Sequence, residues 1–166
     1  PALTDIVVLA PEGRIFVTGP DVVKSVTGED VDMASLGGPE AHSKNSGVAH
    51  VIAASEGAAI DAIRQATALF ANQGHLDTDL QDLDLSVFVP PVSKRSYEVH
   101  PLIDAILDKD GEKLELLPVW AENMSTVLGR FGGRTVGVIA NNPAHIGGVL
   151  DSAAAEKAAR FVRTCD

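Results

Sequence analysis

Length, composition and charge already exclude several classes of protein. A chain of 166 residues has the length of one ordinary domain, which buries roughly 70% of its unfolded surface without disulfides or metals. Hydrophobic residues make up 45% of the chain and charged residues 22%, and this balance excludes an intrinsically disordered protein. The net charge of −10 repels phosphate backbones, so we expect no nucleic-acid partner.

The cysteine count and the hydropathy pattern bear on the compartment. Cys165 is the single cysteine, which excludes an intrachain disulfide framework and a cysteine-based zinc site and favours a reducing cytoplasm. No apolar run reaches the roughly 20 residues of a membrane helix, so we expect no membrane partner. The chain begins at Pro1 without an initiator methionine, which indicates a piece of a longer polypeptide.

The first half of the chain predicts a ββα start followed by a strand and a long helix. Apolar, β-branched runs at 6–10 and 14–17 predict two strands, and the residues after them predict a short helix that ends at Gly28. Residues 50–54 predict another strand, and residues 56–70 predict a helix. The buried stripe expected on that helix follows the helical period and comprises Ile60, Ile63, Ala66 and Phe70.

The segment 74–96 differs in composition from its surroundings. Four aspartates crowd positions 77 to 84, and Pro90-Pro91 follows them. Like-charge repulsion extends such a segment, and the proline pair neither continues a helix nor joins a central sheet. We interpret residues 74–96 as a solvated acidic linker between two structural units.

The rest of the chain predicts a helix, three strands and a closing helix. Gly132-Gly133 lies between two strand-like runs and is the strongest hairpin signal in the sequence. An acid or a serine is available to cap the last helix. The expected elements are a helix at 98–107, strands at 114–117, 125–131 and 134–140, and a helix that begins after Asp151 or Ser152.

Two glycine-rich stretches are the candidate binding segments. Each lies at a strand end, where ligands of α/β proteins tend to bind, and glycine lets backbone N–H groups approach a ligand closely. The simpler alternative is that these glycines only make turns. The candidate pocket residues are Ser46, Gly47, Val48 and His50 in the first stretch, and Asn141, Asn142, Pro143, Gly147 and Gly148 in the second.

Common catalytic and metal motifs are missing from the sequence. It contains no G-x-G-x-x-G, no P-loop, no H-E-x-x-H and no G-x-S-x-G, so the usual support for dinucleotide, nucleotide, zincin and hydrolase functions is lacking. The five histidines are widely separated and lack the close pairs of a metal site, so we expect no metal. No carboxylate pair is placed for the addition of water by a hydratase.

Several blocks of the sequence follow the pattern of one family in the same order. The longest are GRIFVTGPDVV at 13–23 and GGRTVGVIANNP at 132–143. Shorter blocks lie at 27–30, 36–38, His42, 46–50 and 156–163. Together they resemble the carboxyltransferase (β) subunit of biotin-dependent acyl-CoA carboxylases, in particular the actinobacterial acetyl/propionyl-CoA carboxylases. Long ordered blocks are far more specific than a single short motif.

The resemblance implies a fold and a domain organisation. The family has the α/β crotonase (ClpP-like) fold, in which ββα units form a superhelix, and its chains contain two such domains. On this basis residues 1–73 are the C-terminal part of the first, acyl-CoA-side domain. Residues 74–96 are the linker, and residues 97–166 are the start of the second, biotin-side domain.

The resemblance also implies a reaction and partners. A carboxyl group passes from carboxybiotin to acetyl-CoA or propionyl-CoA, giving malonyl-CoA or methylmalonyl-CoA for fatty-acid synthesis. The implied partners are the acyl-CoA substrate, a biotin carboxylase, a separate biotin carrier subunit that delivers the carboxybiotin, and further copies of the chain in a homo-oligomer, a hexamer. Two glycine-rich oxyanion-hole loops of the family fall outside residues 1–166, so we expect no catalytic residue here and no turnover by this chain alone.

Two other functions stay open at this point. A decarboxylase subunit of the same superfamily moves the carboxyl group from acyl-CoA to biotin, and these residues separate the two poorly. A non-catalytic assembly fragment would associate with other subunits without turnover. The sequence also leaves the preferred acyl chain open.

Overall fold

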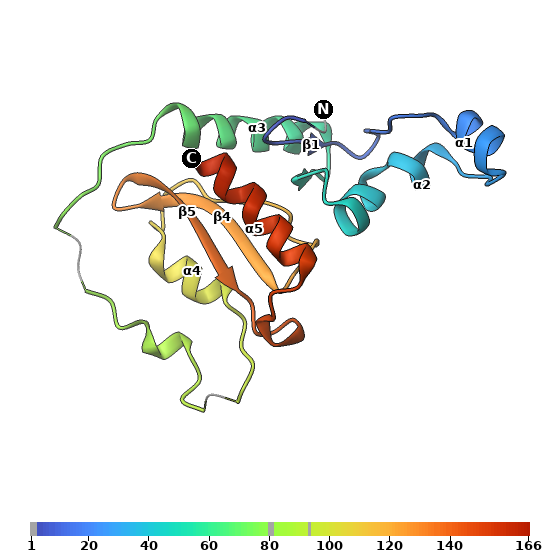
Figure 1. Ribbon diagram of the computed structural model, residues 1–166. Coiled ribbons are helices and arrows are strands. Elements are labelled where there is room, and N and C mark those ends of the chain that lie inside the picture. Colours follow the sequence, from blue (N-terminus) through green and yellow to red (C-terminus); the bar gives the residue numbers. More distant parts are fainter. Residues whose placement is uncertain (1–2, 80–81, 93) are drawn as a thin grey trace. The chain divides into compact units, whose positions relative to one another are not determined.

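The computed structural model describes residues 3–79, 82–92 and 94–166. The chain divides into two compact units, Pro1–Ile63 and Arg64–Asp166, and each is described by itself. Figure 1 shows the order of the helices and strands along the chain.

A short parallel ladder joins the two ends of the first unit. Strand β1 (Val8–Leu9) pairs with strand β2 (Val51–Ile52). The predicted strands at 6–10 and 50–54 are confirmed, although each contributes two residues to the ladder. The buried core beside the ladder is formed by apolar side chains: Val7, Leu9 and Ala49, with Ile15 packed against them.

Helical segments connect these two strands. Helix α1 (Pro20–Thr27) has proline in its first turn and ends at Gly28, whose φ is 78°, as the sequence predicts. Helix α2 (Met33–Gly37) is capped by the carboxylate of Asp32. A π-helical turn, Ala41–Ser46, then leads toward β2.

The predicted strand at 14–17 is wrong. Its Ile15 N–H donates to the carbonyl of Gly37 in α2 at 2.8 Å rather than to a neighbouring strand. A Cβ at position 37 would lie 2.2 Å from the Ile15 carbonyl oxygen, so glycine is needed for this close approach. Arg14 turns back and donates to the carbonyl of Pro11 at 2.9 Å, which closes a turn in place of a ladder.

Helix α3 (Glu56–Ala71) contains residues of both units, and its buried face differs from the predicted stripe. Ala66 of the predicted stripe is buried, as predicted, whereas Ile60, Ile63 and Phe70 are exposed by 50%, 52% and 38%. Hydropathy favours the large side chains, whereas packing selects alanines because their small side chains let a helix lie close to its neighbours. The buried side chains of the helix are Ala59, Ala66 and Leu69.

An antiparallel sheet in the order β3-β4-β5 forms the centre of the second unit. Strand β3 (Leu114–Glu115) pairs with β4 (Met124–Phe131), which pairs with β5 (Arg134–Asn141) along its full length. Gly132 and Gly133 have φ of 53° and 79°, which is the left-handed pair that a two-residue hairpin turn requires. The predicted hairpin is confirmed.

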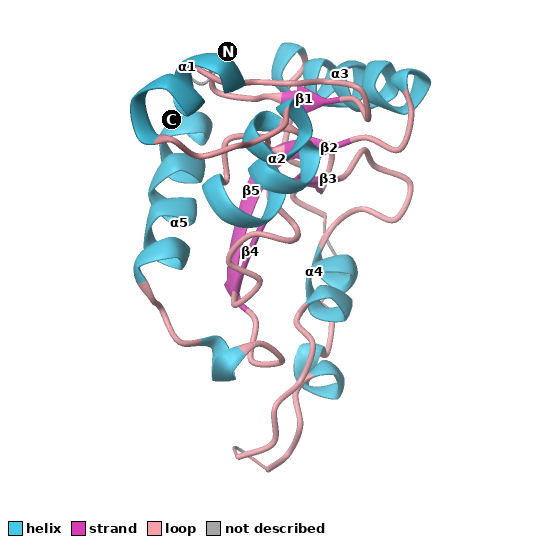
Figure 2. Cartoon of the chain, turned by 90° about the vertical axis from the view of Figure 1, so that its right-hand side faces the viewer, coloured by secondary structure: helices cyan, strands magenta, loops and turns pink. Residues whose placement is uncertain are grey.

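Helices cover both faces of this sheet, as Figure 2 shows for α4 and α5 on opposite sides of the hairpin. Helix α5 (Ser152–Cys165) packs on β4 and β5. Gly137 of β5 faces α5, since a Cβ there would meet the Sγ of Cys165 at 2.6 Å. Helix α4 (His100–Ile106) lies on the other face, where the core consists of Val99, Ile103, Leu107 and Val127, with Leu102, Val136, Val138 and Ala140 packed against it.

Candidate functional site

The loop after β5 leaves the sheet through left-handed backbone. We call residues 141–150 the glycine loop. Ile146, Gly147 and Gly148 have φ of 40°, 68° and 70°, and the β-branched Ile146 is strained in this conformation. A Cβ at Gly147 would meet nothing within 4 Å, so this backbone borders open space.

Asn142 anchors the start of the glycine loop. Its side chain is 1% exposed, and its Nδ2 donates to Oε1 of Glu98 at 2.7 Å. Its backbone N–H donates to the carbonyl of Asn123 at 2.9 Å, and its Oδ1 accepts from the N–H of Ala144 at 3.2 Å. These hydrogen bonds of the buried Asn142 fix the backbone at the start of the glycine loop.

The neighbouring Asn141 closes the same loop. Its Nδ2 donates to the carbonyl of Gly148 at 2.6 Å, and a Cβ at Gly148 would lie 3.3 Å from the backbone nitrogen of Pro143. The five candidate residues of this stretch thus form one structure, in which the side chains shape the loop and the backbone of Gly147 borders open space.

Glu98 connects the glycine loop to a chain of charged groups. Its Oε1 accepts hydrogen bonds from Asn142 and from His100 Nδ1 at 2.5 Å, and His100 Nε2 lies 2.9 Å from Oε1 of Glu115. Burial opposes the charge of the His100 ring, but hydrogen bonds to Glu115 and Glu98 outweigh it and raise the pKa of His100. Burial likewise opposes ionisation of Glu98, and its hydrogen bonds with His100 and Asn142 lower the pKa of Glu98.

Asn123, at the end of the β3–β4 connection, holds the other side of the glycine loop. Its side chain is buried, and Nδ2 donates to the carbonyl of Val149 at 2.6 Å and to Oδ1 of Asp151 at 3.3 Å. The same carboxylate oxygen accepts from the N–H of Ala154 at 2.8 Å and caps α5. This confirms Asp151 as one of the two predicted caps and ties the helix start to Asn123.

Lys157 projects from α5 into the β3–β4 connection. The residue is 1% exposed, and Nζ donates to the carbonyl oxygens of Leu117, Trp120 and Ala121 at 2.7, 2.8 and 3.3 Å. Burial lowers the pKa of Lys157 to about 8, and the charges of Glu115 and Glu122 oppose that shift. A buried lysine with three acceptors is a satisfied group, so its role is to hold this connection.

The candidates of the first unit contact the π-helical turn and the β1–β2 ladder. Ser46 Oγ lies 2.8 Å from His42 Nδ1, and it accepts from the N–H of Val48 at 3.3 Å. Gly47 follows the π-helical turn with φ of 58°. His50 is 5% exposed, and its Nδ1 accepts from the N–H of Val7 at 3.1 Å.

The polar groups that support the glycine loop are not among the residues predicted from the sequence. Ala154, Lys157 and Phe161 are the buried residues of α5, and their helical spacing on one face could have placed Lys157 in the interior. Asn123 and Glu98 carry no comparable signal, because their partners are distant in sequence.

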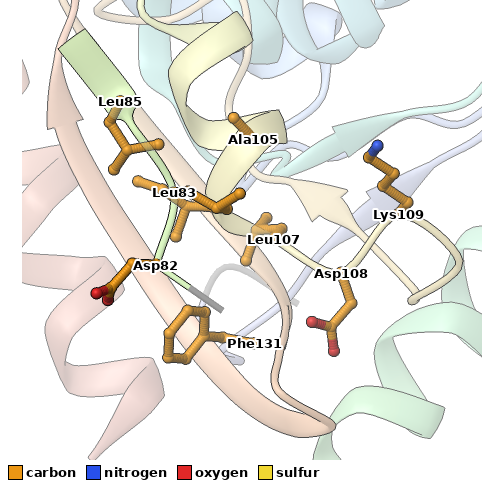
Figure 3. Close-up of a pocket in the computed structure, with 9 residues that line it drawn as sticks. Asp82, Leu83, Leu85, Ala105, Leu107, Asp108, Lys109 and Phe131 are labelled. Carbon is orange, nitrogen blue, oxygen red and sulfur yellow. The ribbon is translucent and has the colours of Figure 1, made fainter. Parts of the chain in front are cut away.

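An apolar pocket of about 570 Å³ also lies in the second unit. Leucines from the segment around a 3-10 helix, Leu85–Phe88, face the end of α4 and Phe131 across it (Figure 3). Charged groups stand at its border, including Asp82, Asp108 and Lys109 (Figure 3).

Within residues 3–79, 82–92 and 94–166, no group of three or more His, Cys, Asp or Glu side chains is placed to hold a metal ion. Over that same part of the chain, no helix combines the length and apolar character needed to cross a membrane.

Solved structures with the same fold are carboxyl-transferring enzymes. Transcarboxylase 12S with hydrolysed methylmalonyl-coenzyme A bound matches with a TM-score of 0.89 and 36% identity, over 99% of this chain and 34% of that chain. A single-chain, multi-domain long-chain acyl-CoA carboxylase matches with a TM-score of 0.81 and 32% identity, over 99% of this chain and 17% of that chain. The predicted mixed α/β, crotonase-like fold is confirmed.

Sequence relatives identify the family within this class. Residues 1–166 match the model of the carboxyl transferase domain, so the chain belongs to the carboxyl transferase domain family. The beta6 subunit of the biotin-dependent acetyl-/propionyl-coenzyme A carboxylase from Mycobacterium bovis is 57% identical over 100% of this chain and 36% of the relative. The propionyl-CoA carboxylase beta chain from Rhodococcus erythropolis is 52% identical with the same coverage. The predicted family is confirmed, and the chain spans about a third of the length of these relatives.

Proposed function

We propose that residues 1–166 are part of the carboxyltransferase subunit of a biotin-dependent acyl-CoA carboxylase. The reaction carries a carboxyl group from carboxybiotin to acetyl-CoA or propionyl-CoA and yields malonyl-CoA or methylmalonyl-CoA. The observation that carries the proposal is the 57% identity to an acetyl-/propionyl-CoA carboxylase subunit along 100% of this chain. Sequence identity that extends over both units supports the assignment to a carboxyltransferase subunit far better than a single motif does.

In this proposal the two parts of the chain face different substrates. Residues 1–73 belong to the acyl-CoA side, residues 74–96 join the domains, and residues 97–166 belong to the biotin side. Biotin is bound to a separate carrier protein, and what it supplies is the transferable carboxyl group. The left-handed backbone and the open space beside Gly147 fit a pocket wall on the biotin side, and Ser46, Gly47, Val48 and His50 are the proposed wall on the acyl-CoA side.

The residues of this chain shape and hold the site rather than react. Asn142 and Asn123 fix the glycine loop by hydrogen bonds, and we assign stabilisation of the reacting oxyanions to two glycine-rich loops outside residues 1–166. Removal of one oxyanion donor typically lowers a rate by about 10²–10³. The 166-residue chain alone is therefore expected to show no turnover.

The test compares a full-length subunit that contains these residues with residues 1–166 alone. Each is mixed with biotinylated carrier, biotin carboxylase, ATP and labelled bicarbonate, and carboxylation of acetyl-CoA and propionyl-CoA is measured. Turnover by the full-length subunit alone is the expected result, and the ratio of the two products gives the acyl preference. Turnover by residues 1–166 would contradict the placement of the oxyanion loops.

Absence of turnover by both proteins would contradict the carboxylase proposal and favour the decarboxylase, which is then assayed in the reverse direction with malonyl-CoA and free biotin.

Assembly is tested in the same preparations. Transcarboxylase 12S forms a hexamer, and this supports a homo-oligomer of the full-length subunit, which sedimentation measures. Association of residues 1–166 without turnover is the behaviour of an assembly fragment.

A further inference from the structure

We propose that Lys157 is a positioning residue that sets the shape of the glycine loop from outside the loop. It acts through the β3–β4 connection and Asn123, without contact to a substrate. The inference rests on the proposed function in one respect, because the glycine loop is the wall assigned to the biotin side.

The first step is the contact between Lys157 and the β3–β4 connection. Nζ donates to three carbonyl oxygens of one short segment, Leu117, Trp120 and Ala121. Leu117 and Ala121 have φ of 57° and 49°, and a non-glycine residue holds this conformation only when its surroundings impose it. The Lys157 ammonium gathers the three carbonyls around one point and thereby imposes it.

The second step leads from this connection to the glycine loop. The carbonyl of Ala121 accepts from the N–H of Met124 at 3.0 Å, so the bend held by Lys157 fixes the position of Asn123, directly before β4. Asn123 then contacts the loop twice, through its carbonyl to the N–H of Asn142 at 2.9 Å and through its Nδ2 to the carbonyl of Val149 at 2.6 Å. The segments before and after the strained Ile146–Gly148 turn are therefore attached to one residue.

Burial of an ammonium costs free energy unless hydrogen bonds compensate for it. The three acceptors of Lys157 are backbone carbonyls, which no substitution can remove. Loss of the ammonium alone would therefore take a donor away from each of them. Lys157 thus supports the geometry of the connection as well as the packing of α5.

The experiment uses the full-length subunit with four variants. Lys157→Met removes the ammonium and keeps the length of the stem, Lys157→Arg keeps the charge, and Asn123→Ala breaks the second step. Arg163→Met removes a cation from an exposed position on the same helix and is the matched control. Initial rates are measured below the unfolding temperature of every variant, with the biotinylated carrier and the acyl-CoA varied separately.

We expect Lys157→Met and Asn123→Ala each to lower kcat/KM for the biotinylated carrier by about 10²-fold, the effect of a displacement near 1 Å in a reacting site. KM for the acyl-CoA should stay unchanged, and Arg163→Met should match the wild type. The double variant should lose little more than either single one, since both act on one loop. Lys157→Arg should recover part of the loss, because its guanidinium can reach the same carbonyls.

Amide hydrogen exchange of residues 142–149 supplies a readout that needs no turnover. Lys157→Met should speed exchange there and leave the hairpin turn at Gly132-Gly133 unchanged. A folded Lys157→Met with wild-type kinetics, or with unchanged exchange at 142–149, would overturn the inference. If Lys157→Met fails to fold, Lys157→Gln, which lacks the charge and has two amide donors in place of the three of the ammonium, is judged by the same criteria. If the wild type shows no carboxyl transfer, the proposed function fails, and the exchange experiment still judges the role of Lys157.

Discussion

The two units differ in what their buried polar side chains hold together. In the first unit, His50 donates its backbone N–H to the carbonyl of Val7 at 2.9 Å, and its ring Nδ1 accepts from the N–H of Val7 at 3.1 Å. Both bonds join the same two residues and complete the end of the β1–β2 ladder. In the second unit, Asn123 joins the β3–β4 connection to the glycine loop, and Lys157 joins helix α5 to the same β3–β4 connection.

This difference separates support of a fold from support of a loop. A side chain that completes a ladder supplies a hydrogen-bond acceptor to a strand whose shape the ladder already determines, so it contributes mainly to stability. A side chain that joins two irregular connections determines their shape, because no ladder does so for them. We therefore expect changes in the first unit to act mainly on stability, and changes around the glycine loop to act on loop order as well.

The largest stability effect is expected at His50. His50→Ala leaves the N–H of Val7 without its ring acceptor and opens a cavity, and together these lower the free energy of unfolding by about 2–4 kcal/mol. The measurement is urea denaturation, with amide exchange at residues 7–9 as the local probe. His75→Ala, at an exposed position, is the matched control and should stay within about 0.5 kcal/mol of the wild type. Equal losses in the two variants would contradict the ladder role of His50.

A smaller effect is expected at the tip of the second unit's hairpin. The Asp108 carboxylate accepts from the N–H groups of Gly132 and Gly133 at 2.9 and 2.8 Å. Asp108→Ala removes both acceptors and should lower the free energy of unfolding by about 1–2 kcal/mol. Asp108→Asn keeps one acceptor and should lose about half as much. Thermal unfolding compares the two, and unchanged exchange at the turn in Asp108→Ala would show that the turn needs no such support.

The features that the sequence predicts well are those whose signals lie within a few residues of each other. The Gly132-Gly133 pair between strand-like runs predicts the hairpin, and Pro20 with Gly28 predicts both ends of α1. In each case the backbone conformation depends on the residues at the turn or the cap themselves. The family resemblance is also visible in the sequence, because it consists of short local blocks that occur in the same order along the chain.

The features that the sequence does not predict depend on contacts between distant segments. His50 and Val7 are 43 positions apart, and Lys157 and Leu117 are 40 positions apart. Hydropathy places Ile60 and Ile63 inside, although alanines occupy the buried face of α3. The glycine loop could be marked as a candidate from its composition, but the residues that hold it could not, because their partners are set by the tertiary fold.

The smallest expected effect is a pH dependence centred on His100, which joins Glu98 and Glu115 beside the glycine loop. The pKa of His100 is raised above its ordinary value of 6.5, so its contribution is fully present below that pH and is lost as the pH rises through the raised pKa. The lowered pKa of Glu98 keeps its carboxylate ionised across this range. We expect amide exchange of residues 142–149, corrected for its intrinsic pH dependence, to speed up as His100 loses its proton. The comparison is made in a Lys157→Arg background, whose guanidinium stays charged, because burial lowers the pKa of Lys157 to about 8 and loss of that ammonium would also speed exchange here. In that background His100→Gln, which cannot titrate, should show no such step. A step of equal size would assign the effect to another group and remove His100 from the support of the loop.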